Sequence, residues 1–292
     1  MTIETIWKEF SDDIAKIELL HRYEKAMFKK ERDHLLSQKE LIANDEELKN
    51  MPLRADNMFF YDYRKVNHVF YGSSIMKIDD ILRFIDIKQN RDYQFYLASA
   101  YEKFEDAIEL IYAYLGKNDP DFWSLSEYGD EKYSNVNNLD MDFFIKKSKS
   151  KRGGAISIFK NIIEKLNCNI SENHLSLKTE IIMIEKIRHI IIHENGKTKD
   201  KNEFIKRIAT DAGVFNNGNI DKKLTGYVEP LFGKDEYENS VVLIDKSEYL
   251  SSFNRDRLTP LIDTMLFAVY VLCEKAKLYI EGQTEKVVSD GA

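Results

Sequence analysis

Residues 185–197, EKIRHIIIHENGK, place an arginine and two histidines in a segment that is otherwise rich in isoleucine. An arginine carries a fixed charge that can stabilise an anionic phosphate, and a histidine can transfer a proton near neutral pH. Arg188 and His193 could therefore catalyse RNA transesterification, in which one group stabilises the phosphorane-like charge and the other moves a proton. This chemistry needs no metal and no cofactor. The alternative is that these side chains only solvate one side of a helix.

The spacing of the apolar residues predicts that this segment is a helix. Isoleucine would also suit a strand, but the length of residues 171–196 and their polar interruptions at helical spacing favour a helix. Asn195 and Gly196 predict where it ends. His193 then lies in the last turn, where the helix dipole favours an imidazolium. Arg188 lies about 7.5 Å back along the axis and about 140° around it.

A second helix is predicted upstream, over residues 91–115. Its apolar residues recur at steps of three and four, and Gly116 would supply a C-terminal stop. These apolar residues are Leu97, Tyr101, Phe104, Ile108, Ile111 and Leu115. The preceding segment, residues 77–92, is expected to form a short helix and a connector.

The composition indicates a globular, mainly α protein. The 292 residues are 43% hydrophobic and 32% charged, and they include only four prolines and twelve glycines, which is too few for a turn-rich β fold. Cys168 and Cys273 lie far apart, so neither a disulfide framework nor a cysteine zinc site is expected, and reduced thiols suit the cytoplasm. The N-terminus does not resemble a signal peptide, and charges interrupt the apolar window from Leu261. We therefore expect no membrane partner.

The chain is expected to divide into three parts. Residues 1–88 would form an N-terminal helical extension, residues 89–283 the main helical domain, and residues 284–292 a polar tail. Within the extension, residues 50–74 change character to an aromatic cluster that the pattern assigns to neither helix nor strand. One short β-hairpin or strand is expected around residues 241–244.

The run Arg188-His189-Ile190-Ile191-Ile192-His193 resembles the signature of the HEPN-domain ribonucleases, which is Arg, a polar residue, a short apolar stretch and His. The order of elements is similar as well. A long helix carries a Phe104-Glu105 pair, and a loop, the motif helix and a closing apolar helix at about residues 257–281 follow. The resemblance covers roughly residues 89–283.

This resemblance implies a HEPN-like helical bundle that forms a homodimer, so that two motif helices meet in one RNA-cleaving cleft. Arg188 and His193 would be catalytic, and His189 would fill the polar slot of the motif. Such proteins resemble toxins or anti-phage defence effectors, which implies an antitoxin or a defence-system partner. Asn195 is a departure, because one branch of the family has a tyrosine there that its partner modifies. Control through that tyrosine is therefore not expected.

Other residues complete the predicted site. Glu105 and Glu102 on the upstream helix are candidates to hold Arg188 in place. His189 and His193, four residues apart, could instead bind a metal, but no third ligand is evident, so no metal site is expected. The net charge is −7, yet basic residues outnumber acidic ones around the motif. The candidate RNA-binding residues are Lys186, Lys197, Lys199 and Lys201. The alternative function is a non-catalytic HEPN-like module that binds RNA or protein.

Overall fold

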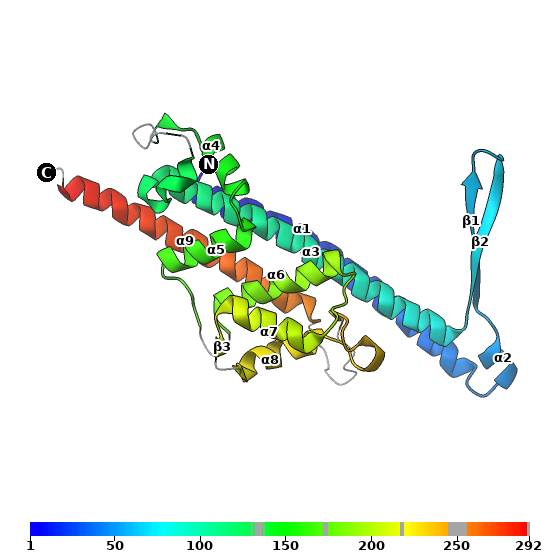
Figure 1. Ribbon diagram of the computed structural model, residues 1–292. Coiled ribbons are helices and arrows are strands. Elements are labelled where there is room, and N and C mark those ends of the chain that lie inside the picture. The colour runs from blue at the N-terminus through cyan, green and yellow to red at the C-terminus, as the bar shows by residue number, and fades with distance from the viewer. Residues whose placement is uncertain are drawn as a thin grey trace. The chain divides into compact units, whose positions relative to one another are not determined.

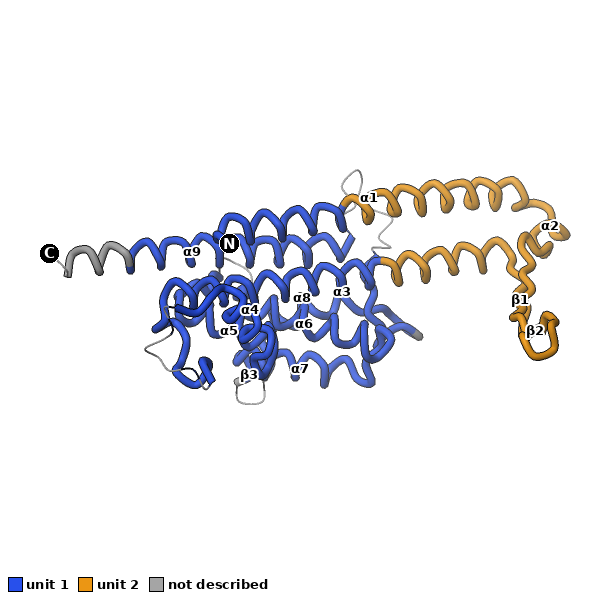
Figure 2. Tube along the Cα trace, turned by 90° about the horizontal axis from the view of Figure 1, so that it is seen from above, with its two compact units in different colours: residues 1–18, 93–292 blue, residues 19–92 orange. Residues whose placement is uncertain are grey.

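The computed structural model describes residues 1–129, 131, 136, 138–171, 175–216, 219–244 and 256–290. It is mainly helical (Figure 1), which confirms the predicted class. The chain divides into two compact units, residues 1–18 with 93–292 and residues 19–92 (Figure 2). Residues 1–18, which the sequence assigned to the N-terminal extension, thus belong to the larger unit. Two long helices contribute to both units, α1 (Ile3–Leu41) and α3 (Ile78–Asn118).

The larger unit is a helical bundle built around one hydrophobic core. At its centre α6 (Leu177–His193) lies against α5 (Gly154–Lys165), α7 (Lys201–Ala212) and α9 (Leu258–Asp290). Nine of the 17 residues of α6 are buried, most of them isoleucines, because its apolar stripe faces these neighbours. The remaining elements are α4 (Met141–Lys149), α8 (Lys222–Val228), the two-residue strands β3 (Phe215–Asn216) and β4 (Asn219–Ile220), and 3₁₀ turns at Pro120–Phe122, Leu125–Tyr128, Glu229–Leu231 and Asp235–Tyr237.

The predicted ends of the upstream helix were wrong. α3 is continuous from Ile78, so the expected short helix and connector are its first turns, and it passes through Gly116 to Asn118. Gly116 serves a different purpose, since a Cβ atom there would overlap the Trp123 ring. That ring stacks on Tyr112, with centroids 5.1 Å apart, and its Nε1 donates to the Tyr112 carbonyl. The glycine is needed for close packing and not for a helix cap.

The smaller unit, residues 19–92, contains a β-hairpin, the longer of the two antiparallel strand pairs in the described part of the chain. After α2 (Glu46–Asn50), strands β1 (Arg54–Asp62) and β2 (Asn67–Met76) pair antiparallel, with an irregularity between Met58 and Phe59. The buried core of this unit is small, consisting of Phe28, Leu35, Ile78 and Ile85. An ion pair of 2.6 Å between Lys39 and Asp79 and another between Arg32 and Asp86 join its two helical segments.

Two further expectations need correction. The strand or hairpin expected at residues 241–244 does not form, because Val241 makes only an isolated bridge with Phe232, while residues 245–255 lie outside the described residues. The hairpin lies at residues 54–76 instead. The closing helix also runs further than the expected end near residue 281, since α9 continues to Asp290. Among the described residues, no helix combines the length and apolar character needed to cross a bilayer.

We predict that Gly116→Ala lowers the free energy of unfolding by about 1–3 kcal/mol, because its methyl group would overlap the Trp123 ring. The matched control is Gly226→Ala in α8, where no atom lies within 4 Å of the new Cβ. That change should be neutral or stabilise by up to about 1 kcal/mol. Urea unfolding followed by circular dichroism measures both. Equal effects of the two substitutions would contradict the packing role of Gly116.

Candidate active site on helix α6

Local backbone interactions define both ends of α6. At its start, the Ser176 hydroxyl accepts a hydrogen bond from the Thr179 backbone N–H. At its end, Asn195 and Gly196 adopt positive φ values of 57° and 76°, and the Gly196 N–H donates to the Ile190 carbonyl at 3.0 Å. The predicted Asn-Gly stop is therefore confirmed.

Gln94 on α3 anchors the turn that follows α6, a role that the sequence did not reveal. Its side-chain amide donates to the Val241 carbonyl at 2.8 Å, and the Val241 N–H donates to the Gly196 carbonyl at 2.8 Å. A Cβ atom at Gly196 would lie 2.8 Å from the Gln94 amide and would have to be held at a φ of 76°, so glycine is favoured at this position. Three segments far apart in sequence thus determine where the last turn of α6, with His193, is placed.

Arg188 lies at the edge between the buried stripe of α6 and α3. Its Nη2 is 3.9 Å from Glu105 Oε2, and its guanidinium carbon lies 5.8 Å from the centroid of the Tyr101 ring. The Arg188 Nε and the Tyr101 hydroxyl are both buried, and neither has a hydrogen-bond partner among the described residues. The Glu105 contact is too long for a hydrogen bond. The guanidinium therefore keeps donor capacity that a second anion could use.

The surroundings of the Glu105 carboxyl disfavour its charged form. Burial raises its pKa, and the nearby carboxylates of Glu102, Glu185 and Asp106 raise it further, whereas Arg188 lowers it. The balance leaves the pKa of Glu105 above its usual value. Acidification would therefore protonate Glu105, and weaken its hold on Arg188, at a higher pH than for an ordinary exposed glutamate.

The two histidines form a second group at the C-terminal end of α6. Both are exposed, and their rings contact each other with centroids 4.6 Å apart. No hydrogen bond, ion pair or ring contact among the described residues joins them to Arg188 or Glu105. In one copy of the chain, the structure therefore brings Arg188 together with Glu105, and His189 together with His193, as two separate pairs.

The other predicted site residues differ in their surroundings. Asn195, Lys197 and Lys199 are exposed beyond the end of α6, and Glu102 is exposed on α3. Lys186 pairs with Asp211 at 2.8 Å and with Glu185 at 3.3 Å. Lys201 lies 3.7 Å from Glu238. The charges of Lys186 and Lys201 are thus already balanced, and their contact with RNA stays a prediction with less electrostatic support.

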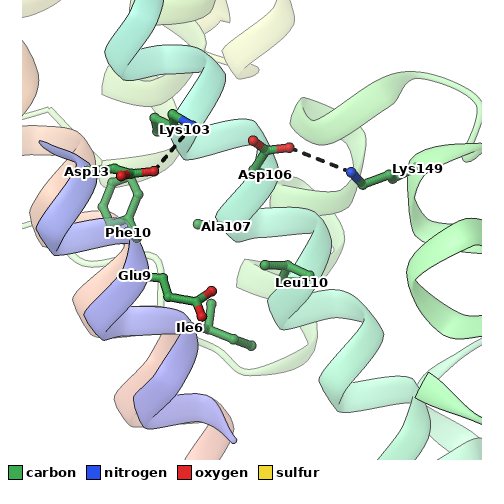
Figure 3. A pocket seen from close by; sticks show the side chains of 9 residues that line it. All are labelled: Ile6, Glu9, Phe10, Asp13, Lys103, Asp106, Ala107, Leu110 and Lys149. Atoms are coloured by element: carbon green, nitrogen blue, oxygen red, sulfur yellow. Dashed lines mark ion pairs between the residues drawn. The ribbon is translucent and has the colours of Figure 1, made fainter. Parts of the chain in front are cut away.

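A cleft lined by other residues lies nearby on α3. Its volume is about 240 Å³, and it lies between the first turns of α1, the middle of α3 and Lys149 (Figure 3). Two ion pairs cross it, Asp13 with Lys103 at 3.2 Å and Asp106 with Lys149 at 3.9 Å. None of the predicted site residues lines this cleft. Within the described part of the chain, no group of three or more His, Cys, Asp or Glu side chains is placed to hold a metal ion.

Comparison of the chain with protein-family models, with curated proteins and with solved structures finds no match.

We predict that Arg188→Gln raises the pKa of Glu105 further, because Arg188 is the cation that lowers it. Carboxyl ¹³C NMR titration of the glutamate side chains measures this shift. The matched control is Lys149→Gln, which should raise the pKa of Glu109, the carboxyl that Lys149 influences, and leave Glu105 unchanged. An unchanged Glu105 titration in Arg188→Gln would show that the two side chains do not interact in solution.

Proposed function

We propose that this chain is a metal-independent endoribonuclease that cleaves RNA by transesterification, with Arg188 and His193 as its catalytic residues. The observation that carries the proposal is the position and incomplete hydrogen bonding of Arg188. It is partly buried beside a carboxylate, yet its Nε has no hydrogen-bond partner among the described residues. The rest of the side chain stays 23% exposed, and the Glu105 contact at 3.9 Å is too long for a hydrogen bond, so two oxygens of a phosphate could accept side by side from the outer guanidinium nitrogens.

In the proposed reaction, the ribose 2′-hydroxyl attacks the adjacent phosphorus and loses its proton. The P–O5′ bond breaks, the O5′ leaving group gains a proton, and a 2′,3′-cyclic phosphate and a 5′-hydroxyl result. Arg188 would stabilise the charge on the pentacoordinate phosphorus, and His193, exposed at the end of α6, would transfer a proton. Glu105 acts as a positioning residue, because it limits where the guanidinium can lie.

A homodimer would supply the groups that one copy lacks. The reaction needs one proton acceptor and one proton donor beside the phosphate, whereas on a single α6 neither His189 nor His193 is in contact with Arg188. A two-fold contact between two α6 helices would place two copies of each side chain around one phosphodiester. The exposed Lys197 and Lys199 would then be duplicated near the substrate.

The biological setting follows from the resemblance to HEPN ribonucleases. We infer a toxin or anti-phage defence effector that acts on RNA in the cytoplasm, where the buried thiols of Cys168 and Cys273 stay reduced. An antitoxin or another defence protein would hold such an activity in check.

A second candidate is a non-catalytic module that binds RNA or protein through the same side of α6. The ion pairs of Lys186 and Lys201 favour its protein-binding form, because they leave less positive charge for RNA than the sequence suggested. The two candidates differ in whether phosphodiester bonds are broken.

We predict that His193→Ala and Arg188→Ala each lower the rate of RNA cleavage by about 10²–10⁴-fold, because each removes a group that acts on the transition state. Both side chains lie outside the apolar stripe of α6, so the helical circular dichroism spectrum should be preserved. The measurement is single-turnover cleavage of a labelled RNA by the purified protein. His34→Ala, which removes an exposed histidine of α1, is the matched control and should cleave at the normal rate.

Mixing the two inactive variants tests the shared site, with light scattering giving the oligomeric state. A mixed dimer would restore one arginine and one histidine to the cleft, so partial activity is expected. Full cleavage by His193→Ala would remove the catalytic assignment. A strictly monomeric protein with full activity would contradict the shared site.

A further inference from the structure

The β-hairpin of residues 54–76 exposes a cluster of aromatic side chains. Phe59, Phe60 and Phe70 are each more than half exposed, and Tyr71 and Tyr63 are exposed by 64% and 85%. Most of the large exposed hydrophobic side chains in the described chain lie in residues 19–92. Patches of this kind on a soluble protein mark an interaction surface.

The two faces of the hairpin differ in charge. The pairing register places Asp and Arg residues on one face with Met58 and Phe60, and none on the other. The second face, here called the uncharged face, contains no Asp, Glu, Lys or Arg. Its members are Ala55, Asn57, Phe59, Tyr61, His68, Phe70, Ser73 and Ile75.

Aromatic contacts order the side chains of the uncharged face. Phe59 and Phe70 lie directly opposite each other, with ring centroids 5.5 Å apart. Tyr61 contacts His68 at 5.3 Å and Tyr63, in the connecting turn, at 5.1 Å. Such cross-strand pairs arrange the apolar groups as one continuous patch.

The rest of residues 19–92 does not bury the apolar side chains of the hairpin. A two-stranded hairpin is marginally stable in water and needs further strands or a packed face. The core of residues 19–92 is formed by Phe28, Leu35, Ile78 and Ile85, and it includes no hairpin residue. A partner that covers one face would supply the missing burial.

Charge distinguishes between the kinds of partner. Arg54 pairs with Asp56 at 2.6 Å, and Arg64 pairs with Asp62 at 3.0 Å, which leaves Lys65 as the hairpin's only unbalanced charge. RNA or an anionic membrane would require several unpaired basic side chains. A second uncharged face of the same kind can be covered without burying any unpaired charge.

The exposed area is also sufficient for such a contact. Aromatic side chains offer roughly 150–250 Å² each, and an isoleucine somewhat less. The exposed parts of Phe59, Tyr61, Phe70 and Ile75 therefore amount to about 400 Å², and Tyr63, which contacts Tyr61 from the connecting turn, brings the continuous patch to about 600 Å². Two copies would bury about 1,200 Å², which is the lower end for a specific protein interface. We propose that the uncharged face of the hairpin binds the same face of a second copy of this chain. This contact is separate from the one proposed for α6 and does not require RNA cleavage.

Hydroxyl-radical footprinting of the full-length protein over a range of concentrations tests the contact residue by residue. Modification of Phe59, Tyr61 and Phe70 should fall several-fold as the concentration rises. Phe60 and Tyr71, whose rings lie 6.4 Å apart away from this face, should change little. Because the readout is local, dimerisation through α6 would not produce this pattern.

Paired substitutions provide the second measurement. Phe59→Lys and Phe60→Lys place the same charge on adjacent, equally exposed positions of opposite faces. In sedimentation equilibrium, Phe59→Lys should raise the dissociation constant by more than about tenfold, and Phe60→Lys should change it little. The proposal is overturned if both faces are protected equally, if no protection depends on concentration, or if the two variants associate alike. Protection of Phe59 by added single-stranded RNA at low protein concentration would also overturn it, in favour of nucleic-acid binding.

Discussion

The position of Arg188 beside Glu105 is the constraint on which the proposed chemistry of α6 depends. α6 is held in the bundle by its buried isoleucines, and Arg188 lies at the border of that apolar stripe. A guanidinium in this position needs an anion nearby, and α3 provides one in Glu105. Burial and three neighbouring carboxylates raise the pKa of Glu105, whereas Arg188 lowers it, so only Arg188 favours the charged form of this carboxyl. An incoming phosphate would compete with Glu105 for the same guanidinium, which links substrate binding to the position of this side chain.

The two units differ in how many of their apolar side chains they bury. The larger unit buries its apolar residues in one core and leaves polar side chains at the end of α6. Residues 19–92 bury few apolar side chains and expose many, which is the basis for the contact proposed for the hairpin. Because α1 and α3 contribute to both units, each unit is built on helices that also serve the other. If both proposed contacts exist, the chain has one surface for chemistry and another for assembly.

Local signals made part of this structure predictable from the sequence. The helical class follows from the scarcity of turn residues, and the end of α6 follows from Asn195 and Gly196, which adopt the left-handed backbone that their residue types favour. Gly116 misled the same reasoning, because its lack of a side chain accommodates Trp123, which no local pattern reveals. The hairpin was missed because apolar residues occupy both of its faces, so residues 57–63 show no alternation.

The candidate site was predictable in its residue types more than in its contacts. The sequence indicated Glu105 as a partner for Arg188, and the ion pair at 3.9 Å agrees with that expectation, whereas Glu102 has no ion pair with Arg188 among the described residues. Contacts between distant segments, such as Lys186 with Asp211, could not be predicted from the sequence.

The central claim is that α6 supplies its own charge and proton carrier for RNA cleavage. Its most direct test is to incubate the purified protein with RNA in EDTA and identify the product ends. Our account predicts cleavage with 2′,3′-cyclic phosphate and 5′-hydroxyl ends, and cleavage that stops on chelation, or that leaves 3′-hydroxyl and 5′-phosphate ends, would contradict it.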